Sequence, residues 1–154
     1  MDMPKPSPQQ KKLERLAGDW DGDEKVYPTP WDPAGGPARG RVKNVMAVDG
    51  FALVQEYEQE RGGAVNFRGH AILHHDAAAS EYVLVWIDNS GMGLSTYRGT
   101  FEGDVLTMSS KQPMGQARAT WTIEGKDTYR YLMEVSPDGA AWHPFLEGTY
   151  RRQR

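Results

Sequence analysis

The chain has 154 residues, a length that can bury a hydrophobic core without metal ions or disulfides. Its 38% hydrophobic and 25% charged residues, 17 glycines, 10 prolines and lack of cysteine are typical of a globular protein with many turns. This composition excludes disulfides, thiolate catalysis and cysteine-ligated zinc, and the formal net charge of -3 gives no electrostatic reason to expect nucleic acid as a partner.

The N-terminal segment precedes one short predicted helix. Residues 1–6 are expected to form a flexible tail, and residues 7–17 a helix that Ser7 caps, Pro8 begins and Gly18 ends. The chain contains no apolar run of signal-peptide length and none near the ~20 residues of a membrane span. We therefore expect a cytoplasmic protein with no membrane partner.

After Gly18 the hydrophobic pattern alternates with a period of two, which predicts β-strands. The ten predicted strands are residues 19–27, 38–48, 51–61, 64–74, 81–88, 94–102, 105–111, 116–124, 127–135 and 140–151. Every connection is short enough for antiparallel neighbours, and closure of the sheet would remove its two exposed edges. The sequence predicts an all-β, closed, up-and-down antiparallel barrel of about ten strands, lipocalin-like, which forms a single domain over residues 1–154.

Counting strands places the turns at two ends of this barrel. The helix shares one end with the turn at Asp49-Gly50 and is expected to plug it. The other end gathers loops that contain Trp31, Met92 and Met114, flanked by glycine or proline. These side chains form an adaptable apolar gate or simply cover the barrel, since methionine is flexible and polarizable.

The segment Leu16-Ala17-Gly18-Asp19-Trp20 resembles the Gly-x-Trp sequence that opens the first strand of lipocalins and related barrels. In that superfamily an arginine of the last strand commonly packs over the tryptophan. The ending Tyr150-Arg151-Arg152 therefore implies a contact with Trp20 at the seam between the first and last strands.

The whole chain resembles the DUF1579 family, bacterial proteins of uncharacterised function with a lipocalin-like (calycin) barrel. The matching stretches are Leu16 to Trp20, Trp31 to Gly35, Asp49 to Phe51, Phe67 to His70, Arg98 to Asp104, Pro113 to Gly115 and Met133 to Gly139. The resemblance implies the fold but carries almost no function. Related barrels include fatty-acid carriers, haem-binding nitrobindin-like proteins and a few isomerases and cyclases, which serve only as analogies.

The histidines do not predict a metal site. His70 and His74 share a strand face, but four residues at about 3.3 Å each place them ~13 Å apart. His75 points the other way, and His143 lies on a distant strand. A haem needs one axial ligand, which any of the four could supply, so the sequence requires no cofactor and does not exclude haem.

Two adjacent strands carry a polar cluster whose orientation depends on their register. In one register Arg68 and His70 face Asp88 and Trp86, which makes an ion pair beside an aromatic side chain. A slip of one residue places Phe67 and Trp86 on an apolar inner face instead and turns Arg68 and His70 outward.

Arg118 raises a similar question, because an arginine inside a barrel needs a carboxylate, a backbone acceptor or an anionic ligand. Aromatic side chains such as Tyr97 and Trp121 are numerous enough to line a cavity or to fill a core. The candidate ligand-binding residues are Arg68, His70, Trp86, Tyr97, Met114, Arg118 and Trp121. No hydrolase elbow, phosphate-binding loop or zinc-protease motif occurs, so catalytic residues stay unassigned.

Three hypotheses follow. The first is a binding protein that holds a small apolar or amphipathic ligand in the barrel, with an anionic group of the ligand met by Arg68 or Arg118. The second is an isomerase- or cyclase-type enzyme in the same cavity, with an inward-facing His70 as acid or base. The third is a homodimeric interaction protein that uses an apolar surface patch and binds no ligand.

Overall fold

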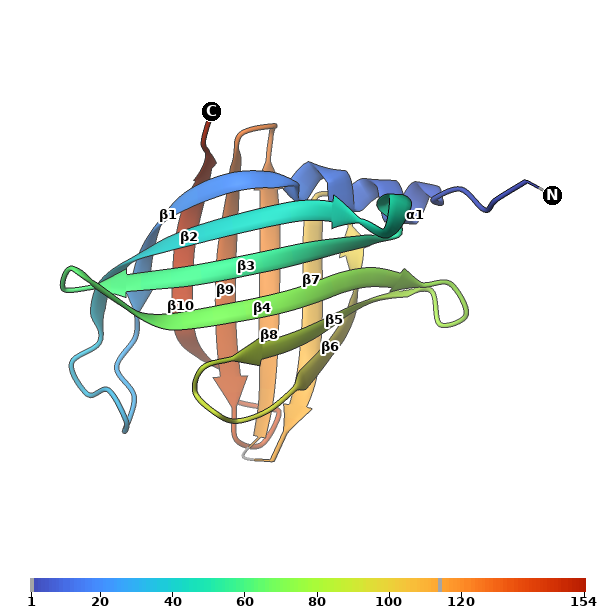
Figure 1. The fold of residues 1–154 in the computed structure, drawn as a ribbon. Coiled ribbons are helices and arrows are strands. Elements are labelled where there is room, and N and C mark those ends of the chain that lie inside the picture. Colours follow the sequence, from blue (N-terminus) through green and yellow to red (C-terminus); the bar gives the residue numbers. More distant parts are fainter. Residues whose placement is uncertain (1, 114) are drawn as a thin grey trace.

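The computed structural model describes residues 2–113 and 115–154 and forms a closed antiparallel barrel (Figure 1). Each strand pairs with its neighbours in the sequence, and β1 pairs with β10 to close the sheet. The strands are β1 (Gly18–Val26), β2 (Gly36–Ala47), β3 (Ala52–Arg61), β4 (Ala64–Asp76), β5 (Glu81–Asp88), β6 (Ser95–Glu102), β7 (Val105–Gln112), β8 (Gly115–Glu124), β9 (Thr128–Ser136) and β10 (His143–Arg152). The predicted ten-stranded, up-and-down, lipocalin-like barrel is confirmed.

The predicted N-terminal helix is present and plugs one end of the barrel. It begins as α1 (Pro8–Lys11) and tightens into the 3₁₀ helix η1 (Lys12–Leu16). The Ser7 side chain accepts a hydrogen bond from the Gln10 amide, while the Gln10 side chain accepts one from the Ser7 amide. Leu13 and Leu16 of η1 are buried in the core, which explains why the helix stays against this end.

The seam between β1 and β10 has the contact that the family resemblance implied. Trp20 pairs with Arg152, whose guanidinium carbon lies 4.3 Å from the centre of the indole ring. The same guanidinium donates hydrogen bonds to the backbone carbonyls of Ala17 and Lys126. One arginine therefore ties the first strand, the last strand and the helix end together.

The strand ends lie within three residues of those predicted, and β10 differs most, starting at His143 instead of residue 140. Asp138 explains the difference. Its carboxylate accepts hydrogen bonds from the amides of Ala140 and Ala141, which holds these residues in the preceding turn.

Two of the three side chains predicted to gate or cover the end opposite α1 lie in the described residues, and both are exposed. Trp31 and Met92 are 80% and 77% exposed, and Met114 lies outside the described residues. The loop that contains Trp31 is instead fixed by Arg61, which pairs with Asp32 and donates to the Gly35 carbonyl. Among the described residues, no helix combines the length and apolar character needed to cross a membrane.

Candidate ligand-binding site

The register between β4 and β5 determines which candidate side chains face the barrel interior. Ala71 pairs with Trp86 and His70 pairs with Ile87, which is the slipped register of the two that the sequence left open. Arg68 and His70 consequently lie on the outer face. There Arg68 pairs with Glu58 and His70 with Glu56, both across the strand pair β3–β4.

Arg118 also lies outside the barrel. Its guanidinium pairs with Glu134 at 3.0 Å and stacks over the Trp142 ring at 4.1 Å. The anionic ligand group that the sequence assigned to Arg68 or Arg118 would therefore find neither arginine on the inner surface.

The other histidines also lie away from the centre of the barrel. His74 shares the outward side of β4 with His70, and His143 is exposed at the start of β10. His75 packs edge-on against Tyr82, 4.9 Å away between ring centres, at the helix-plugged end.

The inner surface does contain the three predicted aromatic residues. Tyr97 and Trp121 are buried, whereas Trp86 packs against the core and stays partly exposed. Gly69 makes room for the Trp86 ring, since a Cβ at this position would overlap the indole. Met114 lies outside the described residues, so its place is not assigned.

The most unusual inner side chain is Glu24, which sequence reasoning missed. It is 5% exposed and lies on β1, two pleats beyond Trp20 on the same side of the strand. The signal was present in the alternation of β1, because Glu24 occupies an inward position between Trp20 and Val26 while Asp19, Asp21 and Asp23 occupy the outward ones.

Neutral hydrogen-bond donors surround the Glu24 carboxylate. The Tyr57 hydroxyl lies 2.9 Å from Oε1 and 2.8 Å from Oε2, and the Tyr150 hydroxyl donates to Oε2. The Gln59 amide donates to Oε1 at 3.2 Å and to the Tyr57 hydroxyl at 3.1 Å. Within the described residues, Glu24 forms no ion pair, so in its ionised form the carboxylate is balanced by hydrogen bonds alone.

Three glycines create the space for this group. A Cβ on Gly40 of β2 would overlap the Glu24 carboxylate, and a Cβ on Gly22 or Gly148 would crowd the Tyr150 ring. Gly22 pairs with Gly40 across β1–β2, so two side chains are absent from adjacent strands at one level. The backbone is thus shaped around Glu24 and Tyr150.

Burial raises the pKa of Glu24 above its ordinary value, although the hydrogen bonds from Tyr150, Tyr57 and Gln59 act in the opposite direction. Burial also raises the pKa of Tyr57, as does the nearby Glu24 carboxylate. Burial raises the pKa of Tyr150 in the same way. Both phenols therefore remain protonated donors at neutral pH, and Glu24 is the group here that can take up or release a proton.

A second carboxylate lies on the inner surface toward the end opposite α1. Asp88 accepts a hydrogen bond from the Trp86 indole at 2.7 Å. Burial alone would raise the pKa of Asp88, but hydrogen bonds from Ser90 and Trp86 lower it overall. Because the Trp86 ring lies 6.2 Å from the Tyr57 ring, aromatic contacts connect the surroundings of the two carboxylates.

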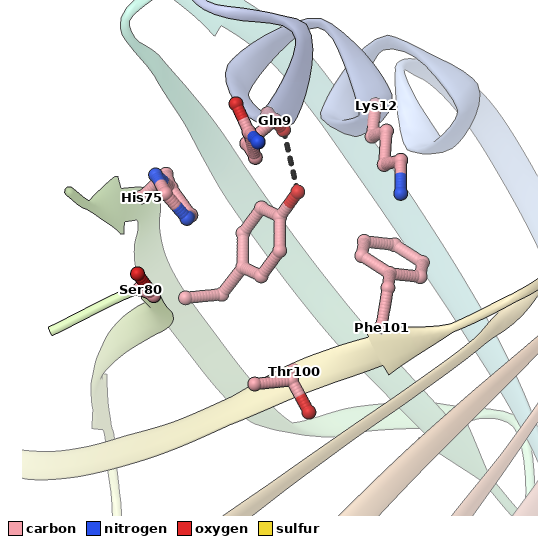
Figure 2. A pocket seen from close by; sticks show the side chains of 7 residues that line it. Gln9, Lys12, His75, Ser80, Thr100 and Phe101 are labelled. Carbon is pink, nitrogen blue, oxygen red and sulfur yellow. Dashed lines mark hydrogen bonds between the residues drawn. The ribbon is translucent and has the colours of Figure 1, made fainter.

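Two surface hollows lie at the helix-plugged end, away from Glu24. One, of about 250 Å³, lies between α1 and the ends of β4 to β6 (Figure 2). In it the Tyr82 hydroxyl donates to the Gln9 carbonyl at 2.6 Å, and the Lys12 ammonium lies 5.8 Å from the centre of the Phe101 ring. The other lies beside Arg15 and Arg152. The polar groups of the first hollow hold the helix in place, and the arginines of the second are paired with Asp104 or stacked on Trp20. We therefore take Glu24 and its surroundings as the candidate site.

The fold has solved relatives of low sequence identity. Rv2717c from M. tuberculosis matches with a TM-score of 0.73 and 17% identity, over 96% of this chain and 99% of that chain. The S-type phycobiliprotein lyase CPES from Guillardia theta matches with a TM-score of 0.62 and 9% identity, over 97% of this chain and 99% of its own. A de novo designed fluorescence-activating β-barrel matches with a TM-score of 0.50 and 13% identity, over 92% and 96%. At these identities the similarity shows the fold alone.

A comparison with curated proteins found no match. The model of the family described as "Protein of unknown function (DUF1579)" matches residues 5–152, which is nearly the whole chain. This match agrees with the closed barrel, the helix plug and the Trp20–Arg152 seam described above. The chain belongs to the DUF1579 family.

Proposed function

We propose that this protein binds a small apolar or amphipathic molecule inside the barrel, through the end opposite α1, and performs no chemistry on it. The observation that carries the proposal is a difference between the two ends of the interior. Leu13, Leu106 and Met108 of the core are 0% exposed, whereas the inner side chains Phe67 and Trp86 pack against the same core and remain accessible.

This accessible inner surface is apolar and largely aromatic. It includes Tyr131 and Met133 of β9 in addition to Phe67 and Trp86, and Tyr131 lies 5.1 Å from Trp121 between ring centres. Burying such surface is the main source of affinity in sites for small molecules, and a few polar groups then fix the orientation of the ligand. Glu24 and Asp88 are suited to that second task.

The names of two barrel neighbours support the ligand-binding part of this proposal. One is named a phycobiliprotein lyase and another a fluorescence-activating barrel. The enzyme hypothesis, by contrast, relied on an inward-facing His70, and this ring lies on the outer face beside Glu56.

The cytoplasmic location and the single domain over residues 1–154 with a tail at residues 1–6 remain predictions from the sequence.

Titration with Nile red, a neutral dye whose emission rises in apolar surroundings, tests the proposal. Ala38 is half-buried, lies on the inward side of β2 and pairs with Glu24, so Ala38→Trp would place an indole in the proposed site. We expect saturable one-to-one binding by the wild type and about tenfold weaker binding by Ala38→Trp, since the added ring occupies volume that the dye needs.

The matched control is Thr96→Trp, which adds the same ring at an exposed position of β6. It should bind the dye like the wild type. Equal binding by the wild type and Ala38→Trp, with both variants folded, would place the dye elsewhere and contradict the proposal. Native mass spectrometry and an absorption spectrum of freshly purified protein would reveal a ligand that co-purifies.

A second candidate function is self-association through the outer face of β2 to β5. Val45, Val54, Ile72 and Val85 are paired in one row across these four strands, and Val45 and Ile72 are 50% and 44% exposed. Beside this row lie charges of both signs, Lys43 and Glu56 among them. Such a surface is complementary to a second copy related by a two-fold axis.

Light scattering after gel filtration distinguishes the two candidates. A dimer that Ile72→Glu converts into a monomer, combined with no dye binding by either form, would favour the interaction protein. A monomer of the wild type would remove this candidate.

A further inference from the structure

We infer that the ligand carries a protonated, hydrogen-bond-donating nitrogen, such as an aliphatic or benzylic ammonium group, and that Glu24 receives it. This inference rests on the proposed binding function and specifies the chemical class of the ligand. It reverses the polarity expected from the sequence, which paired an anionic ligand with Arg68 or Arg118.

In the part of the chain that the structure describes, the fully buried polar and charged side chains include an acid but no cation. Among the described residues, the buried polar and charged side chains are Glu24, Asn44, Ser110 and Ser136, with no lysine, arginine or histidine. The half-buried Asp88 adds a second acid beside Trp86. The two arginines that the sequence proposed as partners of an anionic ligand are paired outside the barrel, Arg68 with Glu58 and Arg118 with Glu134. The half-buried Arg61, beyond Gln59 on β3, is already paired with Asp32. Among the described residues, an anionic ligand would therefore bury its charge near two acids without an unpaired cation to balance it.

The walls of the interior favour a cation as well. Tyr57, Phe67 and Trp86 contact one another, with ring centres 6.1 to 6.5 Å apart. Aromatic faces attract cations through their quadrupole, and this attraction strengthens where water is displaced. A ligand with an apolar body and an ammonium group would thus gain from apolar burial and from electrostatic attraction at the same site.

Gln59 indicates how the nitrogen would reach the carboxylate. Glu24 is nearly inaccessible, but Gln59 is half-buried and donates an amide N–H to Oε1 of Glu24. At 3.2 Å this is the longest of the hydrogen bonds to the carboxylate, and the amide is neutral. An ammonium group in its place would make a charge-assisted hydrogen bond, which is the stronger kind.

Binding pairs the Glu24 carboxylate with the ammonium group of the ligand, and the free energy needed to desolvate Glu24 is already spent when the protein folds. Folding has removed the Glu24 carboxyl from water and fixed it between Tyr57 and Tyr150. The ligand then contributes the missing positive charge to a group that is oriented in advance, so the pairing loses less to desolvation and ordering than two solvated ions would.

Calorimetric titration with three probes that share one apolar body tests the inference. The probes are 2-naphthylmethylammonium, the neutral 2-naphthylmethanol and the anionic 2-naphthoate. We expect the ammonium probe to bind about tenfold or more tightly than the alcohol, and the carboxylate to bind more weakly than both. Glu24→Gln should remove the advantage of the ammonium probe and leave the affinity of the alcohol unchanged.

Glu58→Gln is the matched control, because Glu58 is an acid of the outer face. It should preserve the preference for the ammonium probe, which excludes a general effect of net charge. If Glu24→Gln does not fold, Asp88→Asn provides a second measurement and should reduce the same preference.

The outcomes separate the two proposals. Nile red binding without any preference for the ammonium probe, or a preference for 2-naphthoate, would overturn the inference and leave the proposed function in place. Failure of the dye and all three probes to bind would overturn the proposed function, and the inference with it.

Discussion

At the scale of single residues, Glu24 combines deep burial with an absence of cationic partners among the described residues. Its hydrogen bonds come from two phenols and one amide, and none of these donors carries a positive charge. Replacing a buried ionised group by an amide of the same shape is often neutral or stabilising, provided that the hydrogen bonds persist. We therefore expect the ionised Glu24 to stabilise the fold less than a glutamine would, which is typical of functional residues.

Glu24→Gln is expected to change how stability depends on pH. Because the pKa of Glu24 is raised in the folded state, its contribution to stability is fully present below the pKa of an ordinary carboxyl group and is lost as the pH rises through the folded-state pKa. The glutamine variant does not titrate there. Its free energy of unfolding relative to the wild type should increase as the pH rises above about 4, as measured by urea denaturation.

Glu58→Gln supplies the comparison, since its carboxyl group lies outside the barrel beside Arg68. It should not reproduce this pH-dependent gain. A wild type that becomes more stable relative to Glu24→Gln as the pH rises would mean that folding stabilises the carboxylate, which is the opposite of a raised pKa.

The identities of the site residues were only partly predictable. Trp86, Tyr97 and Trp121 could be assigned to the interior because aromatic side chains belong to apolar strand faces. Arg68 and His70 could not be placed, since one step in the β4–β5 register reverses both. Glu24 was overlooked because acidic residues flank it in β1, so it looks like part of a solvated strand unless its alternation with Trp20 is followed.

At the scale of elements, the seam between β1 and β10 depends on Arg152 and on the absence of a side chain at Gly18. Gly18 has a positive φ of 128°, and a Cβ there would overlap the Arg152 guanidinium. The planar guanidinium can therefore stack on Trp20 and still reach backbone carbonyls, a geometry that a lysine ammonium cannot reproduce.

Arg152→Lys should lower the free energy of unfolding by about 1 to 3 kcal/mol through loss of the stacking and of the hydrogen bonds to carbonyl groups. Thermal and chemical denaturation would measure the loss. Arg151→Lys is the neighbouring control, since the exposed Arg151 makes only a 3.4 Å ion pair with the exposed Asp23, and it should cost less than about 0.5 kcal/mol. Equal effects of the two substitutions would show that the seam does not depend on the stacked arginine.

Element boundaries were predictable where turn chemistry is explicit. Asp49-Gly50 and Gly62-Gly63 mark turns, and the strands begin or end within two residues of them. The start of β10 was less accurate because the side chain of Asp138 extends the turn, an effect that depends on contacts formed in the folded chain.

At the scale of the whole molecule, the barrel has two different ends. The helix places Leu13 and Leu16 in the core at one end, while inner aromatic side chains stay accessible toward the other. This asymmetry was predictable from the order of strands and turns. The sign of the charge in the interior could not be predicted, because it depends on which side of each strand the charged residues occupy.

The five tryptophans provide the most direct measurement of where a ligand binds, because each gives one indole N–H signal in an NMR spectrum. Trp86 and Trp121 line the interior, Trp20 lies beneath the helix, and Trp31 and Trp142 belong to loops. On titration with 2-naphthylmethylammonium, we predict saturable shifts of the Trp86 and Trp121 signals and unchanged Trp31 and Trp142 signals. Shifts confined to the loop residues Trp31 or Trp142 would place the ligand outside the barrel interior and contradict binding inside the barrel.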